Sequence, residues 1–221
     1  MIEEVKKLVF ELLNNDNTGH GIEHITRVYN LAIKFAKEEK ANLELVSLAA
    51  LLHDVDDYKL FGEKNSNNLT NAKKIMKTVN IDLDTQEKVL EIIRTIGYRR
   101  SLQGIRPKSL EGKIVSDADM CDCIGATGII RLHSYSSYHR KPFFDKNIFP
   151  NENIDIKNYP ICADSAVNHI FEKILKLKKL MLTKSGQKEA TKREKITIDF
   201  LRNLFIEEDA NEWLKYLDEK I

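Results

Sequence analysis

The chain has 221 residues, of which 42% are hydrophobic and 31% charged, and its formal net charge at pH 7 is +1. A charge so close to zero creates no overall field that would attract nucleic acid or an anionic membrane surface. The sequence has no apolar run of about 18 residues and no signal peptide pattern, so we expect a cytoplasmic protein without a membrane partner.

Apolar residues recur at helical spacing along most of the chain and never alternate persistently at the strand period, which predicts an all-α fold. The expected helices cover residues 2–13, 21–40, 43–55, 69–79, 84–96, 164–182 and 187–208, with a short one at the end. Residues 56–67 and 99–109 are expected to be loops, the former mobile. Gly125 and Gly128 are interpreted as small residues on a helix that closely crosses another, because the Lys-Ser/Thr ending of a phosphate loop is missing.

An irregular insertion is expected at about residues 133–160, between this helical region and the C-terminal helices. Its central part, residues 135–159, contains two prolines, several asparagines and six aromatic residues. One interpretation is a lid that brings His133, His139, Arg140 and Lys141 to a phosphorylated ligand. The alternative is a static loop packed by its own aromatic side chains.

Residues 173–195 carry nine basic and two acidic side chains. A basic patch could bind nucleic acid or phosphate, but no aromatic residues are interleaved as stacking platforms. We therefore interpret these lysines and arginines as the solvated faces of amphipathic helices. Cys121, Cys123 and Cys162 match neither a disulfide framework nor a CxxC metal pattern. Cys121 and Cys123 are interpreted as small, semi-buried residues in a reducing cytoplasm.

Four ionisable residues stand in apolar helical segments, where an unpaired charge is costly. The apolar run Ser47-Leu-Ala-Ala-Leu-Leu ends in His53 and Asp54, His24 lies upstream, and Asp119 lies far downstream. Two imidazoles and two carboxylates suit a divalent metal that keeps coordination positions open for water and substrate.

The order of these residues resembles that of the HD-domain metal-dependent phosphohydrolases, His … His-Asp … Asp. Longer segments resemble the small stand-alone HD hydrolases of bacteria and archaea: His20-Gly-Ile-Glu-His24, Ala49-Ala-Leu-Leu-His-Asp-Val-Asp-Asp57, Glu111-Gly-Lys-Ile-Val-Ser-Asp-Ala-Asp119, Gly125-Ala-Thr-Gly-Ile-Ile-Arg131 and Leu182-Thr-Lys-Ser-Gly186. The resemblance implies one HD domain over residues 1–221. It would comprise a helical-bundle core at about 20–130, the insertion and two long C-terminal helices within about 164–221.

The resemblance also implies the roles of individual residues. His24, His53, Asp54 and Asp119 would bind one divalent ion, which could be Mn, Co, Ni, Fe, Zn or Mg. Asp57 would act as general base or orient the attacking water, with Asp56 as an equally exposed competitor. His20 would contact a phosphate oxygen or protonate the leaving group. Phosphate clamps are expected from three basic residues, Lys59, Lys113 and Arg131.

The expected function is hydrolysis of a small phosphorylated metabolite, with nucleotides the favoured class, by a water that the metal activates. The alternative is a non-catalytic HD module that binds a nucleotide through the metal and signals to a partner. No histidine lies between Asp54 and Asp119, which favours one metal and argues against a cyclic-dinucleotide phosphodiesterase or a di-iron oxygenase. A homodimer is compatible with the sequence.

Overall fold

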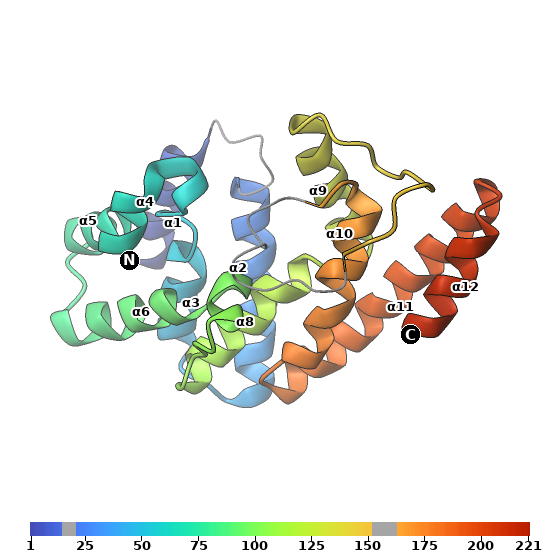
Figure 1. Cartoon of the computed structure of the whole chain (residues 1–221). Coiled ribbons are helices and arrows are strands. Elements are labelled where there is room, and N and C mark those ends of the chain that lie inside the picture. Colours follow the sequence, from blue (N-terminus) through green and yellow to red (C-terminus); the bar gives the residue numbers. More distant parts are fainter. Residues whose placement is uncertain (15–20, 152–162) are drawn as a thin grey trace. The chain divides into compact units, whose positions relative to one another are not determined.

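The computed structural model describes residues 1–14, 21–151 and 163–221, except for the side chain of Lys59. In these residues all regular secondary structure is helical (Figure 1), which confirms the predicted all-α class. None of the described helices combines the length and the apolar character that a membrane span requires. The helices are α1 (Ile2–Leu13), α2 (Ile22–Glu39), α3 (Leu43–Leu52), α4 (Tyr58–Asn68), α5 (Thr70–Thr78), α6 (Leu83–Thr95), α7 (Tyr98–Leu102), α8 (Leu110–Asp122), α9 (Gly125–Tyr138), α10 (Ala166–Glu172), the 3-10 helix η1 (Ile174–Leu180), α11 (Lys184–Glu207) and α12 (Asn211–Lys220).

The chain forms two compact units. The first comprises Met1–Met120 together with Leu182–Gly186, and the second comprises Cys121–Met181 together with Gln187–Ile221. The single-domain organisation expected from the sequence stays a prediction, because two compact units are compatible with one domain or with two.

In the first unit, α3 is the central helix, and every residue from Val46 to Leu52 is buried. A helix that is apolar on all sides must be surrounded by others, and α3 packs against α1, α2 and α6. Its start is fixed by Asn42, whose side-chain oxygen accepts hydrogen bonds from the backbone amides of Glu44 and Leu45. The helix therefore delivers the residues that follow Leu52 from a rigid, buried position.

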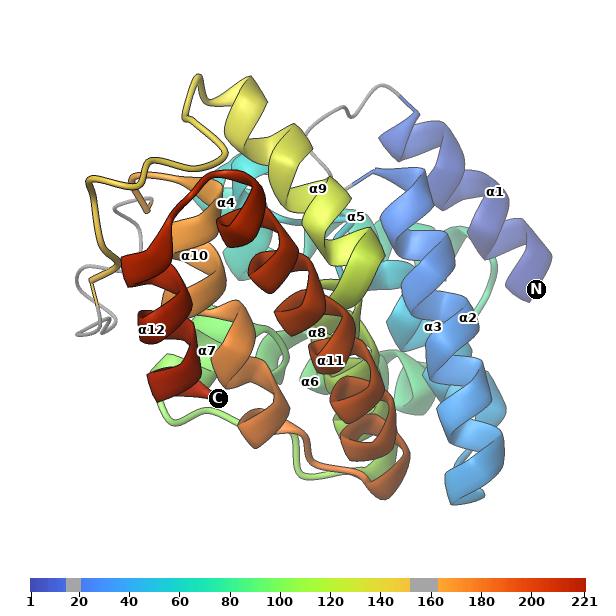
Figure 2. The ribbon, with the colours of Figure 1, turned by 90° about the vertical axis from the view of Figure 1, so that its right-hand side faces the viewer.

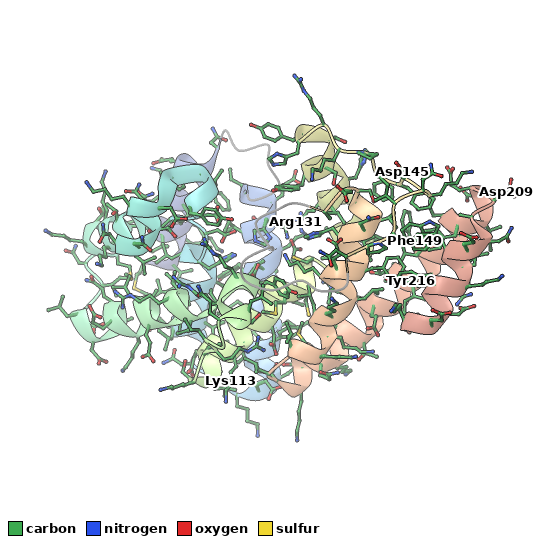
Figure 3. The ribbon with its side chains drawn as sticks, viewed as in Figure 1. Lys113, Arg131, Asp145, Phe149, Asp209 and Tyr216 are labelled. Carbon is green, nitrogen blue, oxygen red and sulfur yellow. The ribbon has the colours of Figure 1, made fainter. Side chains whose placement is uncertain are left out.

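The second unit is built around an aromatic core, with α10, α11 and α12 in the foreground of Figure 2. Its centre is Trp213 of α12, which is 1% exposed and packs against Phe144, Phe171 and Phe205. Phe149 stacks on the same indole at 4.5 Å between ring centroids, and Figure 3 shows it beside Tyr216. Packing of these large rings against one another forms an apolar cluster in this unit.

Several helix boundaries differ from those predicted. Residues 56–67, predicted to be a mobile loop, contain α4, which is kinked at Gly62 where φ is +79°. Predicted loop 99–109 begins inside the short helix α7. Helix α9 continues to Tyr138, so the irregular segment starts at residue 139. The first of the two predicted long C-terminal helices is instead α10 followed by η1, because the helix breaks at Lys173, where φ is −131°.

Candidate metal centre

Two buried imidazoles form the floor of the site. His24 lies in the first turn of α2, and His53 directly follows α3. The Nδ1 atom of His53 lies 2.8 Å from the carbonyl oxygen of Ala50. A carbonyl only accepts hydrogen bonds, so Nδ1 carries the proton and Nε2 keeps its lone pair. That Nε2 atom lies 3.2 Å from Nε2 of His24.

Two carboxylates complete the site. Asp54 Oδ2 lies 3.3 Å from Nε2 of His24 and 3.6 Å from Nε2 of His53. Asp119 Oδ1, from α8, lies 3.5 Å and 3.8 Å from the same two atoms. The imidazoles are 1% and 2% exposed, whereas the side chains of Asp54 and Asp119 are 17% and 22% exposed. The site is therefore open to solvent on its carboxylate side.

These distances are compatible with a divalent cation. Ligand atoms about 2.1 Å from one ion, at angles between 90° and 110°, lie roughly 3.0–3.4 Å from each other. The distances of 3.2 Å and 3.3 Å fall within this range, and those of 3.5–3.8 Å are slightly longer. His24, His53 and Asp119 offer donor atoms that all lie within 4.8 Å of one another, and Asp54 Oδ2 lies near both imidazoles. Two neutral nitrogen donors and two carboxylates suit borderline ions such as Zn²⁺, Mn²⁺ or Fe²⁺. The cluster therefore fits a metal site.

Asp56 and Asp57 have different environments, so the expectation that they are equally exposed is wrong. Asp56 is 3% exposed, and its two oxygens accept hydrogen bonds from the amides of Asn71 (2.8 Å) and Ala72 (2.9 Å) at the start of α5. Burial raises the pKa of the Asp56 carboxyl, and the hydrogen bonds from these amides oppose the shift. Asp57 is half-buried and lies between the turn at residues 53–56 and α4, rather than on a continuous helix with His53.

Three other predicted site residues are His20, Lys59 and Lys113. His20 and the side chain of Lys59 lie outside the described residues. Lys113 is half-buried on α8, six residues before Asp119, which places it on another face of the helix and about 9 Å away along its axis. Figure 3 shows Lys113 beside the N-terminal half of α8. Its role as a phosphate clamp remains a prediction.

Arg131 belongs to the second unit, where its Nη1 atom lies 2.9 Å from Oδ2 of the buried Asp122. Arg131 thus forms an ion pair with Asp122, a buried carboxylate that requires a partner. Its predicted contact with phosphate remains a prediction.

Asp117 is not among the site residues predicted from the sequence, although it lies two residues before Asp119 in the segment Ser-Asp-Ala-Asp. Asp117 is 0% exposed and is hydrogen-bonded to residues Leu182 and Thr183. The sequence does contain a signal that could have identified Asp117. It is an aspartate inside an otherwise apolar helical segment, and such a group needs a buried partner. That partner lies 65 residues further along the chain, at a distance that no local pattern reveals.

Comparisons with known proteins agree with this geometry. Residues 21–123 match the HD domain family. The chain is 30% identical over 205 residues to the protein YpgQ of Bacillus subtilis, with 91% of each chain covered. A crystal structure of YpgQ in complex with ADP has a TM-score of 0.69 at 26% identity, covering 94% of this chain and 97% of that one.

Two further structures are similar over nearly the whole chain. A Lactobacillus plantarum protein has a TM-score of 0.81 at 32% identity, and an HD-superfamily hydrolase from Bacillus thuringiensis has a TM-score of 0.72 at 31% identity. Each comparison covers 95% of this chain and 97% of the other. From the order of the four clustered residues and these matches together, the chain belongs to the HD-domain phosphohydrolase superfamily.

Proposed function

We propose that this protein is a metal-dependent phosphohydrolase that acts on a small phosphorylated metabolite, with a nucleotide as the substrate class. The observation that carries the proposal is the convergence of two buried imidazoles, His24 and His53, with two partly exposed carboxylates, Asp54 and Asp119. These four residues would hold one divalent cation. The exposed carboxylate side leaves room for water and a phosphate group.

The chemistry that a divalent ion supplies in such a site is Lewis acidity, which polarises a phosphoryl oxygen and makes water a better nucleophile near neutral pH. The protein contributes orientation: the carbonyl of Ala50 fixes the tautomer of His53, so that its Nε2 atom faces Nε2 of His24 with a free lone pair. Asp57 is proposed as the general base or as the residue that orients the attacking water. Asp56 is committed to the amides of α5, which leaves Asp57 as the better placed of the two.

The nucleotide class is supported by the relative YpgQ, whose crystal structure contains ADP. We propose one ion rather than two because the sequence has no histidine between Asp54 and Asp119 that could add further ligands. The alternative, a non-catalytic module that binds a nucleotide through the metal, would use the same four residues.

A single screen distinguishes these functions. The purified protein is incubated with nucleoside mono-, di- and triphosphates and with non-nucleotide phosphate esters, each in the presence of Mn²⁺, Co²⁺, Ni²⁺ or Mg²⁺. Metal-dependent release of phosphate or pyrophosphate from nucleotides, abolished by chelation, supports the proposal. Metal-dependent nucleotide binding without turnover supports the binding module. Absence of both contradicts the proposed function.

A further inference from the structure

A second polar centre lies in the first unit, on α8, and none of the roles above uses it. Asp117 is 0% exposed and accepts hydrogen bonds from three donor groups in residues 182–183, directly before α11. The amide of Leu182 lies 2.9 Å from its Oδ1 atom, and the amide and hydroxyl of Thr183 lie 2.8 Å and 2.7 Å from its Oδ2 atom. Each bond compensates part of the cost of burying this carboxylate.

The approach between the chain and Asp117 is so close that only glycine fits at residue 186. A Cβ atom at Gly186 would lie 2.3 Å from Oδ2 of Asp117 and 2.7 Å from its Cγ atom. The amide of Gly186 donates to the hydroxyl of Thr183 (3.0 Å), which itself donates to Asp117. Thr183 thus links the first turn of α11 to the buried carboxylate.

The same segment is also bound to α2. The amide and the hydroxyl of Ser185 both donate to Oε1 of Glu39, each at 2.8 Å, and Glu39 is the last residue of α2. These bonds lower the pKa of the Glu39 carboxyl, since they favour its charged form. Residues Leu182–Gly186, which we call the clip, therefore connect α8 with α2, and these two helices carry Asp119 and His24.

Asp117 and Asp119 face different sides of α8. Two residues correspond to about 200° of rotation around a helix, so one carboxylate faces the clip while the other faces the two histidines. The helix is held from both sides by two side chains that are separated in sequence by a single residue, Ala118. A shift of α8 that loosened the clip would also change the distances from Asp119 Oδ1 to the imidazoles, 3.5 Å and 3.8 Å.

We propose that Asp117, acting through Thr183 and the clip, is a positioning residue for the metal ligand Asp119. This inference rests on the metal centre of the proposed function and adds a residue that does not contact the ion. Metal affinity depends on how precisely the ligands are held, and loss of a supporting group typically lowers it 10- to 100-fold. If Asp117 only stabilised the fold, its replacement would lower the melting temperature of the metal-free protein and leave the metal affinity of the folded protein unchanged.

The test measures Mn²⁺ affinity by electron paramagnetic resonance, and the melting temperature of the metal-free protein, for a small set of variants. Asp117→Asn replaces one accepting oxygen with an NH₂ group, and Thr183→Val removes the hydroxyl at nearly constant volume. Thr183→Ser keeps the hydroxyl. Asp82→Ala is the matched control, because Asp82 accepts the amide of Thr85 (3.0 Å) at the start of α6, a helix of the same unit without a proposed ligand.

We expect Asp117→Asn and Thr183→Val to weaken Mn²⁺ binding by roughly 10- to 100-fold, with Thr183→Ser within about twofold of the parent. Asp82→Ala should lower the melting temperature without changing the affinity. A folded Asp117→Asn or Thr183→Val protein with the affinity of the parent overturns the inference. If Asp117→Asn does not fold, the two Thr183 variants decide. If the parent protein binds no Mn²⁺, the proposed metal centre itself is wrong. This outcome differs from one in which the parent binds Mn²⁺ and the variants bind it equally well, which contradicts only the role of the clip.

Discussion

The Nε2 atoms of His24 and His53 face each other at 3.2 Å in the interior of the first unit. Because Ala50 holds the proton of His53 on Nδ1, the facing nitrogen of His53 has a lone pair directed into the site. Asp54 and Asp119 direct carboxylate oxygens at the same pair of nitrogens. A cation between these four groups would satisfy all of them at once, which explains why such costly residues occupy a buried position.

The first prediction concerns the metal. Asp54→Ala removes one of the two carboxylates, so we expect the purified variant to contain far less divalent metal than the parent while its helical content is unchanged. Elemental analysis after extensive dialysis, with circular dichroism for the fold, provides the measurement. A variant that retains metal at the parent's stoichiometry would show that Asp54 is not a ligand.

The second prediction separates two neighbouring aspartates. Asp57→Asn should keep the metal and the melting temperature but lower turnover by about 10²-fold or more, the usual contribution of a general base. Steady-state kinetics on the substrate identified by the screen provides the measurement. An unchanged rate would remove Asp57 from the catalytic residues.

Asp56→Asn is the matched comparison and should show the opposite behaviour. Oδ1 of Asp56 accepts a hydrogen bond from the amide of Asn71, and Oδ2 accepts one from the amide of Ala72. An asparagine side chain has only one oxygen that can accept such a bond. The variant leaves one amide of α5 unsatisfied, at a cost of about 1–3 kcal/mol in the free energy of unfolding. The melting temperature should therefore fall while the turnover of the folded protein is maintained. If Asp56→Asn instead lost turnover without losing stability, Asp56 rather than Asp57 would be the catalytic aspartate.

The difference between Asp56 and Asp57 shows where prediction from sequence ends. Helical periodicity placed His53 and Asp54 correctly at the end of a buried helix, since α3 is apolar on every side. Periodicity carries no information on a carboxylate that caps a helix 15 residues further along, as Asp56 does for α5. Its burial depends on a tertiary contact that the local pattern does not encode.

The same reasoning applies to the C-terminal region. The apolar spacing predicts one long helix at residues 164–182. In the structure the α-helix ends at Glu172, and the separate 3-10 helix η1 follows it. Phe171, Ile174 and Leu177 are buried in the observed structure, and a continuous α-helix would bury them too. Their spacing therefore does not distinguish one long helix from α10 followed by η1. Packing of the aromatic rings around Trp213 is the tertiary feature that the spacing does not reveal.

The third prediction concerns the segment interpreted from the sequence as a lid or a static loop. The carbonyl oxygen of Lys146 accepts the indole NH of Trp213 (2.9 Å), and that of Ile148 accepts the side-chain amide of Asn168 (3.1 Å). Ring stacking of Phe149 on Trp213 adds a third attachment within the second unit. These contacts favour the static loop over the described part of the segment, residues 139–151.

Hydrogen exchange measured with and without a non-hydrolysable nucleotide analogue tests this. We expect the same protection at residues 143–151 in both states, with Trp213→Phe as a control that removes the indole hydrogen bond and increases exchange there. Increased protection upon nucleotide binding would instead support the lid. The remaining residues of the predicted insertion, 152–160, lie outside those described.

The last prediction concerns the pH dependence of stability and uses Glu172, which belongs to the second unit. Glu172 is 7% exposed on α10, and its Oε1 atom accepts the amide of Asn151 at 2.9 Å. Burial raises the pKa of the Glu172 carboxyl and Asp164 raises it further, while the hydrogen bond from Asn151 and the charges of Lys176 and Lys141 oppose the shift.

The folded protein therefore binds the Glu172 proton more tightly than the unfolded chain does. The stability that this group contributes is fully present below the pKa of the unfolded chain, and is lost as the pH rises through the higher pKa of the folded state. Above that pKa the buried carboxylate is charged, and its burial then costs stability. Glu172→Gln removes the charge but keeps an oxygen that can accept the amide of Asn151.

We expect Glu172→Gln to raise the melting temperature at pH 7–8, where a gain of 1 kcal/mol corresponds to roughly 2–4 °C in a chain of this size. The difference from the parent should shrink towards zero as the pH falls below about 4, because Glu172 is then protonated in both states. Thermal unfolding followed by circular dichroism from about pH 3 to about pH 8 provides the measurement. Glu194→Gln serves as a comparison, since Glu194 is paired with Lys178 and loss of that ion pair should not stabilise the protein. A Glu172→Gln variant that is less stable than the parent at pH 7, or that differs from it by the same amount at every pH, would contradict the raised pKa.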